Sequence, residues 1–199
     1  MLFCPKRRIL LFTPPKCGTN TLHAVLPPLG CRSVYGPQFD GNVGEHTTVW
    51  ESDVWRDLDS YKFAVATRHP FARAASLYGH YRHYWRSPHL GFDDFLEQIV
   101  IAPKYAFFNA TISSILHGIE EPIDGRRPIK VTEIVRLEHL AADLQKLGFA
   151  VADPLPRAHA LPNPGIAAYT PAAKRLVELW ARHDFDRFGY ARDLAAAGW

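Results

Sequence analysis

The sequence predicts an α/β fold in which a parallel sheet is covered by helices on both faces. Two observations lead to this prediction: short apolar runs typical of buried strands, and the amphipathic segments that follow them. Residues 9–13 (ILLFT) predict a first strand and residues 62–67 (KFAVAT) a second. Because strand, loop and helix alternate along 199 residues, we expect a single domain over residues 1–199.

The helices are predicted from their apolar period and their boundary residues. The first runs from Thr19 to Leu29, with apolar residues spaced at i, i+3, i+4 and i+7. Pro70 suits the first position of the second helix, since its fixed φ favours a helix start. The remaining predictions are helices over 92–101, 105–117, 138–147 and 171–183, a strand over 130–136, and an irregular Pro-rich segment over 154–171.

Composition and charge exclude several classes of protein. A net charge of +3 is too small to indicate nucleic-acid binding. The apolar stretch at residues 9–12 is far shorter than the ~20 residues that a membrane-spanning helix needs, and it has no signal-peptide cleavage pattern. Cys4, Cys17 and Cys31 form no zinc-type pair, and we expect no disulfide framework among them. A cytoplasmic location is therefore expected.

The segment between the first strand and the first helix is a candidate anion site. Residues 15–21 (PKCGTNT) place a lysine and a glycine just before a helix start. Backbone N–H groups at such a start attract anions, Gly18 permits close approach of a ligand, and Lys16 adds a charge. In the alternative interpretation, Thr19 or Asn20 only caps the helix and Lys16 is solvated.

This loop does not have the Walker A pattern. That pattern requires a Gly-Lys pair at its helical end, and the chain contains no such pair. An ordinary ATPase or GTPase is therefore disfavoured.

A second candidate segment follows the second strand. Arg68 comes at the end of that strand, and Ser76 lies eight residues later in the following helix. Ligands of parallel sheets collect at the carboxyl ends of the strands, so Arg68 and the Lys16 loop are expected to face one crevice. Alternatively, Arg68 is a surface charge and Ser76 a small packing residue.

Together these segments resemble sulfotransferases that use 3′-phosphoadenosine 5′-phosphosulfate (PAPS). Residues 15–22 (PKCGTNTL) are similar to the 5′-phosphosulfate loop of that family, and residues 68–78, with their Arg-x7-Ser spacing, to its 3′-phosphate motif. Two further matches are residues 136–143, similar to R-x-E-x-L-x-x-D, and residues 184–190, similar to D-F-x-x-F-G-Y. The four occur in the expected order and cover nearly the whole chain.

The resemblance implies a P-loop NTPase-like three-layer sandwich and a role for each site residue. Lys16 is expected to contact the oxygen that bridges phosphate and sulfate. Arg68 and Ser76 are expected to bind the 3′-phosphate. The 5′-phosphate is assigned to the loop residues Cys17, Gly18, Thr19, Asn20 and Thr21. Cys17 and Asn20 each stand at a position where Ser or Thr is commoner in the family. PAPS is the implied co-substrate, and no metal is implied.

Transfer of the sulfuryl group to an acceptor hydroxyl needs a base. His46, in residues 44–48 (GEHTT), resembles the His of an H-[AS]-T stretch in carbohydrate sulfotransferases, and a neutral imidazole accepts a proton near pH 7. Glu45 is the alternative base. Trp85 and Arg86 are candidates for the acceptor site, and two residues of the Pro-rich segment are candidates for a lid: His159 and Asn163.

The sequence therefore predicts a PAPS-dependent sulfotransferase with a hydroxyl-bearing acceptor, a carbohydrate or a small molecule. Two alternatives stay open: an atypical nucleotide-dependent kinase, and a non-catalytic nucleotide-binding protein on the same fold. A kinase would need a carboxylate for Mg²⁺ at a strand end, and the Ala66-Thr67-Arg68 end has none.

Overall fold

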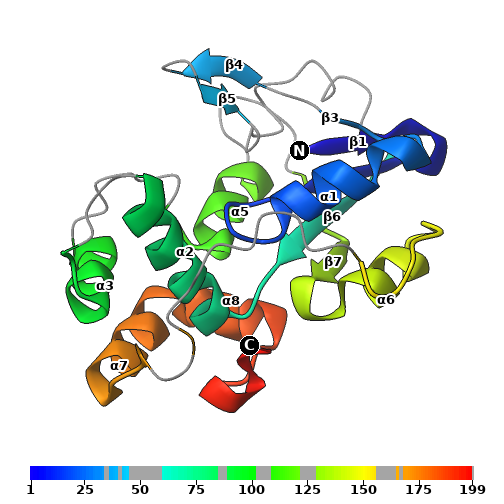
Figure 1. Ribbon diagram of the computed structural model, residues 1–199. Helices are drawn as coiled ribbons and strands as arrows, with labels where there is room; N and C mark the ends of the chain where they lie inside the picture. The colour runs from blue at the N-terminus through cyan, green and yellow to red at the C-terminus, as the bar shows by residue number, and fades with distance from the viewer. Residues whose placement is uncertain are drawn as a thin grey trace. The chain divides into compact units, whose positions relative to one another are not determined.

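The computed structural model is mixed α/β (Figure 1). It describes residues 1–33, 36–39, 42–44, 60–84, 89–101, 109–121, 129–155, 165 and 168–198. The chain divides into two compact units, each described below by itself. The first contains Met1–Thr67 and Leu116–His159, and the second contains Arg68–Ile115 and Ala160–Trp199.

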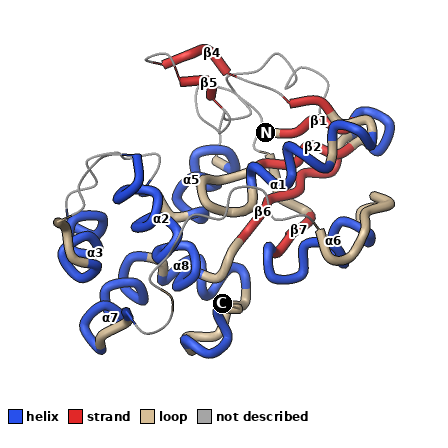
Figure 2. Tube along the Cα trace, viewed as in Figure 1, coloured by secondary structure: helices blue, strands red, loops and turns tan. Residues whose placement is uncertain are grey.

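A five-stranded sheet in the order β3-β1-β2-β6-β7 organises the first unit (Figure 2). The inner strands are β2 (Ile9–Phe12) and β6 (Lys62–Thr67), which pair in parallel, and β7 (Glu133–Arg136) pairs in parallel with β6. All of β2 and all but the first residue of β6 are buried, as expected for strands covered on both faces. The α/β class and the first two predicted strands are confirmed, and the third is confirmed in a shorter form.

The prediction of a purely parallel sheet is wrong at one strand. β1 (Leu2–Cys4) runs antiparallel to β2, and β3 (Arg32–Ser33) is antiparallel to β1. Only the short 3-10 turn η1 (Pro5–Arg7) and Arg8, at φ 54°, separate β1 from β2. A connection this short joins antiparallel neighbours, because a parallel crossover needs a dozen or more residues. The sheet is therefore mixed.

The helices of the first unit are shorter than predicted. α1 (Thr19–Val25) ends before Pro27, and η2 (Pro27–Leu29) continues as a 3-10 turn, because consecutive prolines cannot extend an α-helix. η5 (Leu137–His139) leads from β7 into α6 (Leu140–Lys146). The chain then turns at Gly148, where φ is +83°. A separate hairpin, β4 (Gly36–Phe39) with β5 (Asn42–Gly44), was not predicted.

The second unit is helical. It contains α2 (Pro70–Tyr84), α3 (Phe92–Ile101), α7 (Pro171–Trp180), α8 (Arg182–Phe188) and η7 (Leu194–Ala197). These elements share one apolar core, to which Phe71, Phe95 and Phe185 contribute fully buried rings. The helix predicted from Pro171 to His183 is two helices that meet at Ala181. α5 (Ile112–Glu120), which begins in this unit, overlaps the end of the helix predicted over 105–117 and continues three residues beyond it, and residues 105–108 of that prediction lie outside the described residues.

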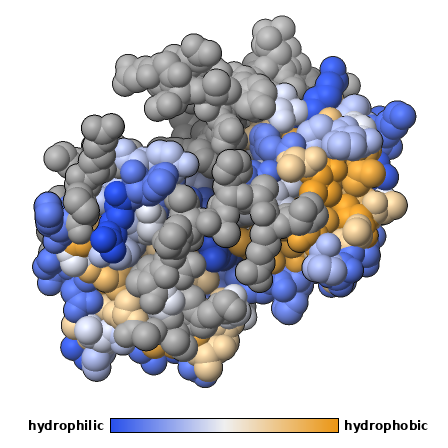
Figure 3. All heavy atoms as spheres, viewed as in Figure 1, coloured by the Kyte–Doolittle hydropathy of each residue, from blue (hydrophilic) through white to orange (hydrophobic). Residues whose placement is uncertain are grey.

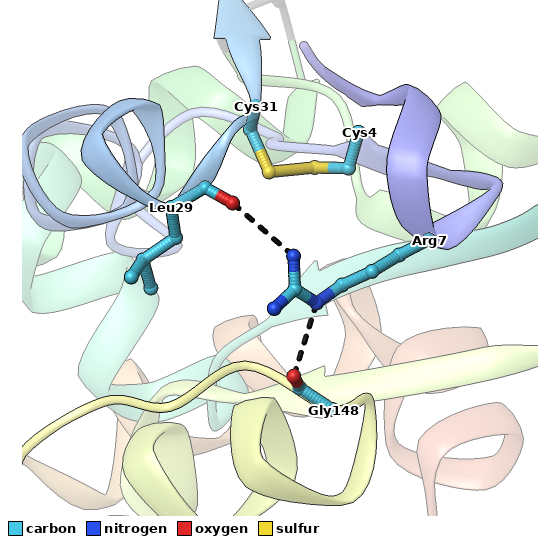
Figure 4. The surroundings of a disulfide bond; sticks show 5 residues. All are labelled: Cys4, Arg7, Leu29, Cys31 and Gly148. Atoms are coloured by element: carbon cyan, nitrogen blue, oxygen red, sulfur yellow. Dashed lines mark hydrogen bonds between the residues drawn. A yellow bond between two sulfur atoms is a disulfide. The ribbon is translucent and has the colours of Figure 1, made fainter.

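A disulfide joins Cys4 to Cys31 in the first unit (Figure 4). The expectation that these cysteines stay unpaired is wrong, because β1 and β3 are neighbours in the sheet and bring the two residues together. The bond closes a loop that contains β2, the Lys16 segment and α1. Beside it, Arg7 donates to the carbonyls of Leu29 at 3.1 Å and Gly148 at 3.0 Å. The cytoplasmic prediction rested on unpaired cysteines, and the disulfide removes that basis.

On the face drawn in Figure 3, the described residues are mostly polar, and apolar residues reach the surface beside α1. Tyr84 and Leu179 are the large apolar side chains that stand exposed within the described ranges. Among the helices that the structure describes, none combines the length and apolar character that crossing a bilayer requires.

Candidate functional site

The Lys16 loop is a tight turn between β2 and α1. The backbone N–H of Cys17 donates to the Pro14 carbonyl at 3.2 Å. Two residues of the loop have left-handed backbone conformations, Lys16 at φ 67° and Gly18 at φ 82°. Such a conformation costs a non-glycine residue about 1–2 kcal/mol, and turns of this kind form anion-binding concavities. The strained residue, Lys16, is the one that the resemblance expects to contact the oxygen bridging phosphate and sulfate.

The side chains of Thr19 and Cys17 form hydrogen bonds within the loop. The Thr19 hydroxyl is buried and donates to the Pro14 carbonyl at 3.3 Å, and the Cys17 thiol is buried and contacts the Pro15 carbonyl at 3.7 Å. These contacts give both side chains an internal role. Lys16 is half-buried and Asn20 is exposed, so these side chains are accessible to a ligand. The first backbone bond of α1 runs from Leu22 to Gly18, which leaves the amides of the first turn without acceptors in the helix.

The strand ends place this loop beside the segment that follows β7. Phe12 of β2 is level with Val65 of β6, which is level with Ile134 of β7. Because the three strands are parallel, the segments after them leave the same edge of the sheet. Leu137, just beyond β7, lies against Gly18: its Cδ1 would be 2.7 Å from a Cβ added there. A side chain at position 18 would therefore require Leu137 to move.

The segment of residues 136–143 has a structural role around Leu137. The Asp143 carboxylate accepts from the Arg136 backbone N–H at 2.9 Å and from Lys146 Nζ at 2.9 Å. Asp143 is buried and thereby fixes the turn that leads from β7 into α6. This turn brings Leu137 to the loop.

Arg68 and Ser76 belong to the second unit, whereas the Lys16 loop belongs to the first. That these residues face one crevice therefore stays a prediction. Arg68 directly follows the last residue of β6, and Ser76 lies in the second turn of α2. Both are half-buried, although every residue between them is buried. Between them, His69 contacts the Ala191 carbonyl through Nε2 at 3.0 Å. Arg68, His69 and Ser76 are thus polar residues among the buried and mostly apolar residues at the start of α2.

Tyr169 was not predicted as part of this region. Its hydroxyl donates to the Phe71 carbonyl at 2.6 Å, at the start of α2. Burial raises the pKa of Tyr169 well above its usual range, while a hydrogen bond from the Ala75 backbone and the positive charge of Arg68 act in the opposite direction. No local signal in the sequence marks this contact, because Tyr169 and Phe71 are far apart along the chain.

The segment of residues 184–190 stabilises the second unit. The buried Asp184 carboxylate accepts from the backbone N–H of Ile112 at 2.9 Å and of Ser113 at 2.6 Å, at the start of α5. Phe185 is buried in the core, and Gly189 ends α8 in a left-handed conformation at φ 67°. This motif therefore holds helices together in this chain.

A buried arginine completes that arrangement. Arg73 has no exposed surface, donates to the Ala110 carbonyl at 2.8 Å and lies over the Trp180 ring at 5.2 Å. Trp180 in turn donates to the Asn109 carbonyl at 2.9 Å. These bonds hold the chain just before α5.

The candidate base and several other predicted residues lie outside the described residues. They are His46, Glu45, Trp85, Arg86, His159 and Asn163. Within the described ranges, no three His, Cys, Asp or Glu side chains gather in a way that could hold a metal ion.

No family model, no curated protein and no solved structure matches this chain.

Proposed function

We propose that the protein is a PAPS-dependent sulfotransferase on a P-loop NTPase-like three-layer fold. The observation that carries the proposal is the Lys16 loop: a lysine and a glycine in left-handed conformations between a buried parallel strand and a helix start. Strain concentrated at a functional residue is typical of binding sites. The resemblance of the four sequence segments to the family supports the same assignment.

In this proposal the loop holds the 5′-phosphosulfate. Amides of the first turn of α1 and the side chains of Asn20 and Thr21 bind the 5′-phosphate. Lys16 contacts the bridging oxygen, where negative charge grows as the S–O bond breaks. Arg68 and Ser76 bind the 3′-phosphate, which distinguishes PAPS from other adenine nucleotides.

The reaction is an in-line displacement at sulfur. The acceptor hydroxyl oxygen forms a bond to sulfur as the bond from sulfur to the phosphate oxygen breaks. His46 takes the hydroxyl proton, and the electron pair of the broken bond leaves with 3′-phosphoadenosine 5′-phosphate (PAP). The acceptor is a carbohydrate or a small molecule with a free hydroxyl.

Calorimetric titration with PAP, ATP and AMP in the absence of added metal tests the proposal. We expect PAP to bind more tightly than ATP or AMP, and Lys16→Ala and Arg68→Ala each to weaken it about 10–100-fold, as loss of one charge-assisted contact does. Lys62→Ala is the matched control, because Lys62 is exposed, pairs with Glu133 and lies at the opposite end of β6. A preference for ATP that depends on Mg²⁺ would contradict the proposal and favour the kinase.

A further inference from the structure

Tyr169 is fixed against the first turns of α2. Its hydroxyl donates to the Phe71 carbonyl at 2.6 Å, and its ring contacts the rings of Phe71 at 5.4 Å and Phe92 at 4.9 Å, both edge-on. The hydroxyl thus reaches α2 while the ring packs against α2 and α3. A buried tyrosine hydroxyl needs a partner, and here that partner is helix backbone.

The residue after Tyr169 is anchored as well. Thr170 caps α7: its hydroxyl accepts from the Ala173 backbone N–H at 3.0 Å and donates to Asp93 of α3 at 2.9 Å. The backbone beside Tyr169 is therefore held in place by hydrogen bonds of Thr170 to α3 and α7, and from there the Tyr169 side chain reaches α2. Its hydroxyl position is determined by packing.

The hydroxyl meets α2 between the two residues assigned to the 3′-phosphate. In an α-helix, the Phe71 carbonyl is the normal acceptor for the Ala75 amide, four residues later. The Tyr169 hydroxyl donates to that carbonyl, and the Ala75 backbone also forms a hydrogen bond with it. A hydroxyl can donate and accept at once, so it bridges both ends of this helical bond.

Arg68 and Ser76 flank this bridge. Arg68 precedes Phe71 by three residues, and its charge acts on the Tyr169 hydroxyl. Ser76 follows Ala75 directly. A side chain inserted beside the i→i−4 bonds of a helix sets the local geometry of that turn.

We propose that Tyr169 is a positioning residue for the 3′-phosphate, holding the turn of α2 that separates Arg68 from Ser76 in its binding geometry. The inference rests on the proposed function and extends it to nucleotide specificity. Tyr169 itself does not touch the phosphate. Its effect is selective for ligands that carry a 3′-phosphate.

PAP and AMP differ only by the 3′-phosphate. Comparing their affinities therefore separates an effect on 3′-phosphate binding from a general effect on nucleotide binding. We expect Tyr169→Phe to weaken PAP about tenfold, the equivalent of one buried hydrogen bond, and to leave AMP unchanged. Thr132→Val is the control: it removes a hydroxyl that donates to the Phe63 carbonyl at 3.3 Å, in the first unit. It should leave both affinities unchanged.

Coupling to Ser76 provides a second readout. In a Ser76→Ala background, Tyr169→Phe should have little further effect on PAP, because the two residues act on one contact. In the wild-type protein, PAP should slow hydrogen exchange of the amides from Phe71 to Ser76 more than AMP does. This measurement does not depend on the folding of any variant.

The outcomes separate the two proposals. Equal wild-type affinity for PAP and AMP overturns the proposed function. If the wild type prefers PAP but Tyr169→Phe leaves PAP affinity unchanged, or weakens PAP and AMP alike, only the role of Tyr169 is overturned. Equal protection of the Phe71–Ser76 amides by the two nucleotides also overturns that role.

Discussion

Leu137 packs directly onto Gly18, with its Cδ1 2.7 Å from the position that a Cβ would take. The contact joins the end of β7 to the Lys16 loop after β2, although β6 lies between these strands in the sheet. Gly18 therefore meets two requirements at once, a left-handed φ of 82° and a close contact with a side chain.

Gly18→Ala should lower the free energy of unfolding by about 1–3 kcal/mol, with about 1 from the left-handed backbone and the rest from displacing the Leu137 side chain. Urea denaturation measures this. Gly30→Ala is the control, because Gly30 has φ +92° but a Cβ there would meet only Lys6, at 3.8 Å. A Gly18→Ala effect no larger than that of Gly30→Ala would show that the Leu137 contact carries no cost.

Lys16→Gly should separate stability from binding. Glycine relieves about 1–2 kcal/mol of left-handed strain but loses about 0.5–1 kcal/mol to chain entropy. The free energy of unfolding should thus stay near the wild-type value or rise, while PAP affinity falls about 10–100-fold. Arg8→Gly makes the same change at another left-handed residue, φ 54°, and should leave PAP affinity unchanged. Unaltered PAP binding by Lys16→Gly would remove Lys16 from the site.

The Cys4–Cys31 bond should stabilise the first unit by about 3–4 kcal/mol, since it closes a loop with a sequence separation of 27. We expect one reactive thiol in the unfolded, unreduced protein and three after reduction, because Cys17 is the free cysteine. Cys17→Ser should keep the response of the melting temperature to reductant, and Cys4→Ser should abolish it. Three reactive thiols before reduction would refute the pairing.

Asp184→Ala should destabilise the fold by about 2–4 kcal/mol, because two backbone N–H groups at the start of α5 lose their acceptor. Asp186→Ala is the comparison on the same helix: that carboxylate is exposed and pairs with Arg192, so its loss should cost less than about 1 kcal/mol. Thermal melts of both variants test this, and equal melting temperatures would argue against the capping role.

His46→Ala should reduce sulfuryl transfer about 10²–10⁴-fold, the usual contribution of a general base, while PAP affinity stays the same. Glu45→Gln should retain most of the activity. The measurement is the rate of transfer to an acceptor found by screening sugars and small hydroxyl compounds with PAPS. Loss of activity in Glu45→Gln alone would make Glu45 the base.

Local patterns were sufficient for the elements with strong signals. The continuous apolar runs predicted β2 and β6, and the apolar period with Pro70 at its start predicted α2. β1 and β3 were missed because strands of three and two residues carry too little pattern, and their partners define them. The disulfide was missed for the same reason, since its pairing depends on β3 lying beside β1.

The candidate site divides in a similar way. The sequence by itself determined which residues could bind an anion, because Lys16, Gly18 and the helix start are contiguous and their chemistry is local. Tertiary structure alone decided that Leu137 lies against Gly18 and that the Tyr169 hydroxyl meets the Phe71 carbonyl. These contacts join residues that are distant along the chain, and only the packing of sheet and helices brings their atoms together.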